Sequence, residues 1–135
     1  MLRVVVDSNL WISYLIGRRL VVLKELFRRG DVLILTSDEQ LAELNEVTSR
    51  FKFRKYFSQE IAEEAISVLY ASSEFVVIDE HVSACRDEDD GFLLELGVNG
   101  HADMIVTGDS DLLVLNPFRG IEIVTYRDFE ERLKK

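Results

Sequence analysis

Short apolar runs alternate along the chain with longer segments in which apolar residues recur every three or four positions. Five runs lack helical spacing and have the length of buried strands: residues 3–6, 31–36, 75–78, 103–106 and 121–125. Helical spacing is present in the segments between and after them: residues 10–29, 37–49, 58–71, 87–98 and a short last helix opened by Thr125 and Asp128. This alternation predicts an α/β fold in which helices cover both faces of a central parallel sheet of about five strands.

Particular residues mark two of the helix boundaries. Ser37 and Gln40 have the spacing of a capping box, in which the serine oxygen accepts from the third helical N–H and the glutamine side chain reaches back. Gly30 is expected to end the helix of residues 10–29. No internal repeat, low-complexity segment or linker interrupts the pattern, which predicts a single domain over residues 1–135.

The composition is that of a globular domain, with 47% hydrophobic residues among 135, enough for a sizeable core. No apolar run approaches the length of a transmembrane helix, and the apolar stretch at the start is too short for a signal peptide. Cys85 is the only cysteine, so an internal disulfide is excluded and zinc-finger spacing is absent. We expect a cytoplasmic protein that does not bind membranes.

Acidic residues follow two of the predicted strands at the point where each strand ends. Asp7 follows the first strand, and Asp109 and Asp111 come just after the fourth. In parallel α/β sheets the ligand lies outside the carboxyl ends of the strands. The spacing therefore predicts that these carboxylates meet at one edge of the sheet, with Gly108 letting the backbone turn tightly before Asp109.

Two predicted helices carry further acidic candidates. At about 100° per residue, Asp89 shares the apolar side of its helix with Phe92, Leu93 and Leu96. A carboxylate there must be partnered or bind a cation. Its neighbour Asp90 lies outside that sector.

Glu43 lies on the polar face of its helix, near the apolar border, so its spacing is only weak support for a place in the acidic site. No cluster of Lys or Arg accompanies the acidic motifs. Carboxylates held together raise one another's pKa and destabilise the fold, whereas a hard divalent cation reverses that effect. Such a cation also lowers the pKa of a bound water and stabilises charge on a phosphodiester. The acids therefore predict a site for Mg²⁺ or a similar ion.

The charge of the chain limits how it could bind nucleic acid. A net charge of −9 argues against a generic nucleic-acid binder, whose surface is usually basic. The segment RFKFRKYF at 50–57 is a local exception, because it places four basic residues among aromatic residues: Arg50, Lys52, Arg54 and Lys55. It is either an RNA-binding segment or a basic loop at a helix end whose aromatic residues belong to the core.

Four stretches resemble, in order, the four acidic motifs of the PIN domain: VVVDSNLWIS at 4–13, LAELNEV at 41–47, RDEDDGFL at 86–93 and IVTGDSDLL at 105–113. The resemblance covers essentially the whole chain. It is closest to the toxin components of toxin–antitoxin systems related to VapC-like toxins. It implies a Rossmann-like three-layer α/β/α sandwich and a metal-dependent endoribonuclease.

The resemblance also implies roles for individual residues. The catalytic quartet would be Asp7, Glu43, Asp89 and Asp109, the metal ligands Asp7, Asp89, Asp109 and Asp111, and the supporting residues Ser8, Asn9, Asp90 and Thr107. Glu88 stands where many members have proline, so the register is open and Asp90 could replace Asp89. The implied cofactor is Mg²⁺ or Mn²⁺, the substrate is RNA, and the implied partners are a cognate antitoxin and a second copy of the chain in a homodimer.

Two other functions stay open. The fold could serve as a non-catalytic module that binds RNA or an antitoxin. A receiver-like phosphoacceptor domain also has alternating strands and helices, and Asp79 follows the third predicted strand. That class needs an acidic pair after the first strand and a lysine after the fifth, where this chain has Asp7–Ser8 and Arg127. No Ser-His-Asp triad, P-loop or dinucleotide glycine pattern indicates other chemistry.

Overall fold

The computed structural model describes residues 1–82 and 88–134, and the side chains of residues 88–90 lie outside the described part. The strands are β1 (Leu2–Val6), β2 (Val32–Thr36), β3 (Glu74–Phe75), β4 (Met104–Val106) and β5 (Glu122–Val124). The helices are α1 (Ser8–Ile16), α2 (Leu20–Arg28), α3 (Asp38–Thr48), α4 (Gln59–Ser72), α5 (Glu88–Asn99), α6 (Ser110–Leu113) and α7 (Tyr126–Leu133), with a 3-10 turn, η1 (Phe51–Phe53), between α3 and α4. No described helix combines the length and apolar content needed to cross a membrane.

The strands form one parallel sheet in the order β3-β2-β1-β4-β5. β1 lies at the centre, where Val5 is in register with Leu35 of β2 on one side and with Ile105 of β4 on the other. The predicted three-layer α/β/α fold around a parallel sheet is confirmed.

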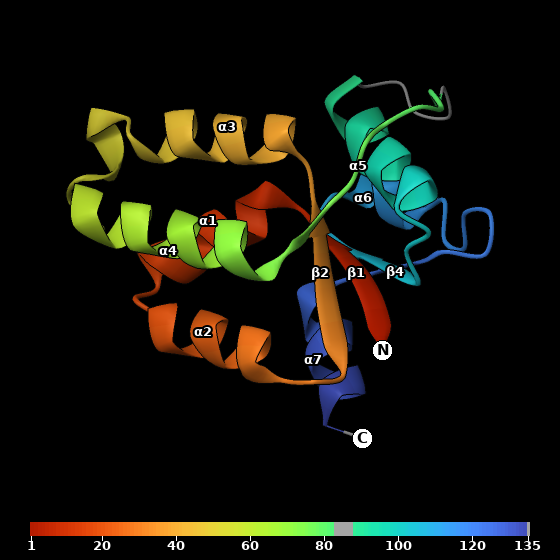
Figure 1. Cartoon of the computed structure of the whole chain (residues 1–135), viewed down its shortest axis with the longest axis horizontal. Coiled ribbons are helices and arrows are strands. Elements are labelled where there is room, and N and C mark those ends of the chain that lie inside the picture. The colour runs from red at the N-terminus through yellow and green to blue at the C-terminus, as the bar shows by residue number, and fades with distance from the viewer. Residues whose placement is uncertain (83–87, 135) are drawn as a thin grey trace.

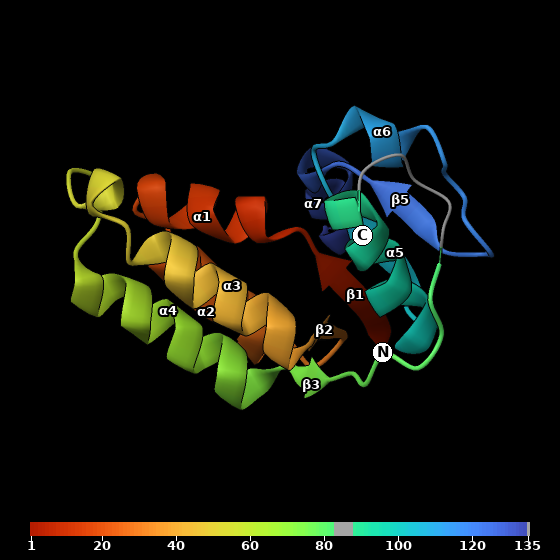
Figure 2. The ribbon, with the colours of Figure 1, turned by 90° about the horizontal axis from the view of Figure 1, so that it is seen from above.

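Side chains that alternate along the strands pack into two cores, one on each face of the sheet. Val4 and Val6 belong to the core shared with α1, α2, α3, α4 and α7. Val5 belongs to the opposite core, with Leu94 of α5 and Leu112 of α6. Figures 1 and 2 show α1–α4 grouped on one side of the sheet and α5 and α6 on the other. The near-continuous apolar runs of the strands follow from this two-sided burial.

The helix predicted over residues 10–29 is divided into α1 and α2. Arg18 adopts a left-handed conformation, with φ 56°, and its backbone N–H donates to Leu15 at 3.1 Å. The N–H of Arg19 donates to Tyr14 at 2.8 Å, which closes α1. Apolar spacing continues across the break, so periodicity alone did not reveal it, although Gly17 marks the place.

The strand predicted over residues 75–78 is also shorter than expected. Glu74 and Phe75 pair with Leu35 and Thr36, the last residues of β2. Beyond Thr36 the neighbouring chain turns into α3, so residues 77 and 78 have no strand to pair with in the described part. The apolar residues after Phe75 therefore continue as an irregular segment.

Candidate active site

The strand order creates a topological switch point between β1 and β4. From β1 the chain moves outward to β2 and β3, and then crosses to β4 and β5 on the other side of β1. In open parallel sheets, ligands bind at such a point, outside the carboxyl ends of the strands. Asp7 follows β1 and Thr107 follows β4 at this point.

Asp7 is half-buried and is fixed from two directions. It is the N-cap residue of α1, where its Oδ1 accepts from the backbone N–H of Asn9 at 3.0 Å. Its Oδ2 accepts from the hydroxyl of Thr107 at 2.8 Å. Its own N–H donates to the carbonyl of Val106 at 2.9 Å, which extends the β1–β4 ladder by one bond. The carboxylate is thus held at the seam between the two strands.

Thr107 connects Asp7 to the second acidic segment. The residue is fully buried, and its Oγ1 accepts from the backbone N–H of Asp109 at 3.1 Å while donating to Asp7. Asp109 caps α6 in turn, because its Oδ1 accepts from the N–H of Asp111 at 2.9 Å. Thr107 Oγ1 therefore links the carboxylate of Asp7 to the backbone of Asp109, and the meeting of the two carboxylates stays a prediction.

Gly108 does not make the turn in the way that the sequence suggested. Its φ lies outside the left-handed region, and a Cβ built on it would meet no atom within 4 Å. The bond from the N–H of Asp109 to Thr107 Oγ1 holds the turn instead.

Gln40 is a buried polar residue, although its spacing from Ser37 predicts only a place in a capping box. The first half of that box is present, since Ser37 Oγ accepts from the Gln40 N–H at 3.2 Å. The side chain of Gln40 does not reach back to Ser37. Its Nε2 donates to the carbonyl of Val6 at 2.9 Å, and its Oε1 accepts from Thr36 Oγ1 at 2.7 Å. Gln40 thus ties the start of α3 to the residue before Asp7. The available signal was its position in the buried stripe with Leu44.

The remaining described candidates lie near this edge with fewer contacts. Glu43 is exposed on α3, one turn after Gln40, and no hydrogen bond or ion pair in the described part joins it to Asp7 or Asp109. Ser8 is half-buried at the start of α1, and Asn9 and Asp111 are exposed.

Asp89 and Asp90 lie in the first turn of α5, and their side chains are outside the described residues. The described part of α5 does not separate them. Leu93 and Leu96 of the predicted sector are buried and Phe92 is half-buried, but the buried side also extends beyond that sector to Leu94. Leu93 lies four residues after Asp89 and three after Asp90, and both spacings place two residues on one face. The register of this motif stays a prediction.

A comparison with family models gives a match to the PIN domain over residues 3–111, which contains Asp7, Glu43 and Asp109 and ends at Asp111. The chain belongs to the PIN-domain family. No curated protein sequence matches the chain. The PIN domain is a nuclease-type fold whose members act on nucleic acid and typically bind divalent metal ions. β5 and α7 follow the matched range.

Lys and Arg side chains in the described part pair with acidic residues other than those at the carboxyl ends of β1 and β4. Those acids are Asp31, Glu46, Glu64, Glu74, Glu80, Glu122 and Glu131. No described base forms an ion pair with Asp7, Glu43, Asp109 or Asp111. Within the described residues, the negative charge at the carboxyl edge is therefore not neutralised by the chain itself.

The donors at this edge fit a hard divalent cation. Asp7 and Asp109, both half-buried, offer carboxylate oxygens, and hard cations such as Mg²⁺ take oxygen ligands. No group of three His, Cys, Asp or Glu side chains close enough to hold a metal ion is found among the described residues. Mg²⁺ commonly uses one or two carboxylates with water and substrate phosphate, so the pair observed here is compatible with it.

Two of the four basic residues in the segment 50–57 form ion pairs or hydrogen bonds with neighbouring residues. Arg50 pairs with Glu46 one turn earlier at 2.8 Å. The guanidinium of Arg54 donates to the carbonyl of Thr48, at the end of α3, and to Gln59 Oε1 at 2.8 Å, at the start of α4. Arg54 therefore joins the two helices.

The other two bases of the segment are exposed. Lys52 and Lys55 have no described acidic partner, and their ammonium groups lie over Phe53 at 5.2 Å and over Tyr56 at 5.0 Å. Phe51 is 89% exposed and Tyr56 is 41% exposed. This segment therefore contains both of the alternatives left open by the sequence, with structural arginines and solvent-facing lysines.

Proposed function

We propose that this PIN domain is a Mg²⁺- or Mn²⁺-dependent endoribonuclease that hydrolyses RNA phosphodiester bonds at the edge between β1 and β4. The observation that carries the proposal is the pair Asp7 and Asp109, joined through Thr107 at the switch point of the sheet. Half-buried carboxylates that served only the fold would be expected to have a basic partner, and the described residues supply none.

Within this proposal the residues have distinct tasks. Asp7 and Asp109 present oxygen atoms to the metal, and Asp111 and either Asp89 or Asp90 add further carboxylates. The N–H of Asn9 and the hydroxyl of Thr107 fix the orientation of Asp7, so that less reorganisation is needed when substrate binds. Glu43, exposed on α3, accepts a proton from the attacking water. A divalent cation, when bound, lowers the pKa of a water and stabilises negative charge on the phosphodiester.

We further propose that the protein is the toxin of a toxin–antitoxin pair and acts as a homodimer in the cytoplasm. The similarity of the four acidic motifs to VapC-like toxins supports this role. Expression of the chain should then arrest growth, and a small protein encoded beside it should relieve the arrest. An unchanged growth rate on expression of an active enzyme would argue for a ribonuclease without a toxin role.

The direct test is cleavage of labelled RNA by the purified protein with Mn²⁺, with Mg²⁺ and with a chelator. Cleavage that needs the metal and is lost in Asp7→Asn supports the proposal. RNA binding without cleavage under every metal condition would identify a non-catalytic module and overturn it.

A further inference from the structure

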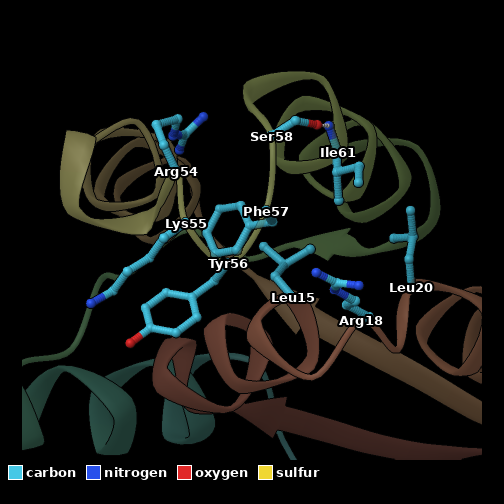
Figure 3. A pocket seen from close by; sticks show the side chains of 9 residues that line it. All are labelled: Leu15, Arg18, Leu20, Arg54, Lys55, Tyr56, Phe57, Ser58 and Ile61. Carbon is cyan, nitrogen blue, oxygen red and sulfur yellow. Dashed lines mark hydrogen bonds between the residues drawn. The ribbon is translucent and has the colours of Figure 1, made fainter.

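A pocket of about 440 Å³ lies between the carboxyl end of α1 and the start of α4. Its floor is apolar, because Leu15 and Phe57 are buried there and pack with Ala62 and Ala65 in a small core of their own. Leu20 and Ile61 complete the apolar lining. Figure 3 shows Phe57 beside Leu15 at the centre of the pocket, with residues from α1, α4 and the segment before α4 around it. The pocket is large enough for a small organic ligand.

The charges around this pocket have one sign. Arg18, Arg54 and Lys55 line it, and no described acidic residue does. The whole chain has 25 acids against 16 bases, so a lining without acids runs against the composition. Arg54 is engaged with Thr48 and Gln59, as described above, whereas Arg18 and Lys55 are exposed and form no ion pair with a described acid. These two cations suit an anionic ligand.

An exposed aromatic ring adjoins the same pocket. Tyr56 lines it and is 41% exposed, and Figure 3 shows its ring and the Lys55 side chain directed to the same side. Aromatic rings that face solvent beside cations are the usual platform for an unpaired nucleobase and its phosphate. An acidic peptide would match the cations but has no comparable use for the ring.

The pocket lies at a distance from Asp7 that an RNA strand can span. Asp7 caps the first turn of α1, and Leu15 and Arg18 lie at the other end of this nine-residue helix. At 1.5 Å per residue the two ends are about 13 Å apart. A stacked strand covers that distance in about four nucleotides, at roughly 3.4 Å each, and an extended strand needs fewer.

We propose that this pocket is a subsite for one nucleotide of a single-stranded RNA, a few nucleotides from the phosphodiester held at Asp7. Tyr56 stacks on the base, Lys55 binds the phosphate on the side of that ring, and Arg18, on the other side of Leu15 and Phe57, binds a neighbouring phosphate. The inference rests on the proposed function, because the strand is placed relative to Asp7 as its cleavage site.

The test measures binding of a fluorescent single-stranded RNA of about twelve nucleotides, in Mg²⁺ and in an Asp7→Asn background that prevents cleavage. Arg18→Gly removes one cation at a position with φ 56°, where glycine relieves backbone strain, so weaker binding cannot be ascribed to unfolding. This variant should lower the slope of log K against log salt by about one. Tyr56→Ala should weaken binding by about five-fold or more, the loss of one stacked base.

Arg19→Gln is the matched control, since it removes the same charge from the next residue. The guanidinium of Arg19 lies over Tyr14 at 5.6 Å and lines a different pocket, beside α7. Binding by this variant should equal that of the parent. Equal losses in the Arg18 and Arg19 variants would show a general charge effect and overturn the subsite. So would unchanged RNA binding by Arg18→Gly together with loss of binding to an acidic Glu/Leu peptide, which would identify a protein ligand.

The outcome is independent of whether the wild-type protein cleaves RNA. If cleavage fails but the Arg18 and Tyr56 variants bind RNA less tightly, the subsite stands and the enzymatic proposal falls. If cleavage occurs and these variants bind like the parent, the enzyme stands and the subsite falls.

Discussion

The hydroxyl of Thr107 donates to Asp7 Oδ2 at 2.8 Å, across 100 positions of sequence. The same oxygen accepts from the N–H of Asp109 at 3.1 Å. One buried side chain therefore sets the orientation of the first acidic residue and the backbone of the second. The backbone of Thr107, just after β4, is held by the hydrogen bond from its own N–H to the carbonyl of Val124, the last residue of β5, at 3.0 Å.

Thr107→Val should lower both stability and activity. Valine has a similar shape but no hydroxyl, so the part-buried N–H of Asp109 and a carboxylate oxygen of Asp7 lose their partner, at a cost of about 1–3 kcal/mol. Thermal melting and RNA cleavage by Thr107→Val and Thr107→Ser measure the effect. Serine restores the donor and should recover most of both quantities. A valine variant as stable and active as the wild type would show that the hydroxyl has no positioning role.

The sequence predicted the parts of the fold that depend on local pattern. Buried strands between amphipathic helices give a parallel sheet, and that prediction is confirmed. The break at Arg18 was missed because apolar spacing runs on from α1 into α2, while the turn depends on backbone hydrogen bonds to Tyr14 and Leu15. The extent of β3 was overestimated because it depends on where its neighbour β2 ends, which is a tertiary property.

The same distinction applies to the site. Asp7 and Asp109 could be assigned to one edge because parallel strands bring their carboxyl ends together. The contacts of Thr107 and Gln40 could not, because they depend on how separate strands and helices are placed against one another. Gln40, for example, bonds to Val6, a residue 34 positions away. The similarity to the PIN domain named Asn9 and Thr107 as supporting residues, but the hydrogen bonds by which they hold Asp7 are visible only in the folded chain.

Asp7→Asn should reduce metal-dependent RNA cleavage by about two orders of magnitude or more, since an active-site metal supplies several kcal/mol. Asparagine keeps the oxygen that caps α1, so the fold should persist. The assay is initial-rate cleavage in Mn²⁺ with a circular dichroism spectrum of each variant. Asp79→Asn, an exposed acid elsewhere, is the control and should match wild type. Wild-type turnover by Asp7→Asn would refute the assignment.

Asp89→Asn should cost far more activity than Asp90→Asn. The similarity to the PIN-domain motif favours Asp89, while the buried residues of α5 favour neither position. Paired measurements of cleavage and of the Mn²⁺ concentration giving half-maximal rate would resolve the register. A more severe effect in Asp90→Asn would move the metal ligand by one residue and contradict the prediction.

Arg54→Gln and Lys55→Gln should separate structure from substrate binding in the segment 50–57. Arg54 loses hydrogen bonds to Thr48 and Gln59, and each such loss typically costs about 1 kcal/mol, more where a buried acceptor is left alone. The melting temperature of Arg54→Gln should therefore fall clearly below that of wild type. Lys55 has no described acidic partner, so its variant should melt like wild type but show a flatter salt dependence of RNA binding. The opposite pattern would reverse these two roles.

Asp109→Asn tests whether the carboxylates hold the fold together or serve a metal. Asparagine can still cap α6 by accepting from the N–H of Asp111, and it removes one charge from an acidic edge with no described cation. In chelator the variant should be as stable as wild type or more stable. A gain of about 1 kcal/mol would raise the melting temperature by roughly 2–8 °C.

Asp109→Ala is the matched variant, because it removes the same charge and the cap as well, and loss of a cap costs about 0.5–2 kcal/mol. Mn²⁺ should raise the melting temperature of wild type by mass action and that of both variants much less. The measurement is a set of melting curves for the three proteins, each in chelator and in Mn²⁺. If Asp109→Asn melts well below wild type in chelator and no protein responds to the metal, the Asp109 carboxylate is structural. A carboxylate that serves only as a metal ligand is repelled by its acidic neighbours when the metal is absent, so its removal would not lower the stability of the metal-free protein.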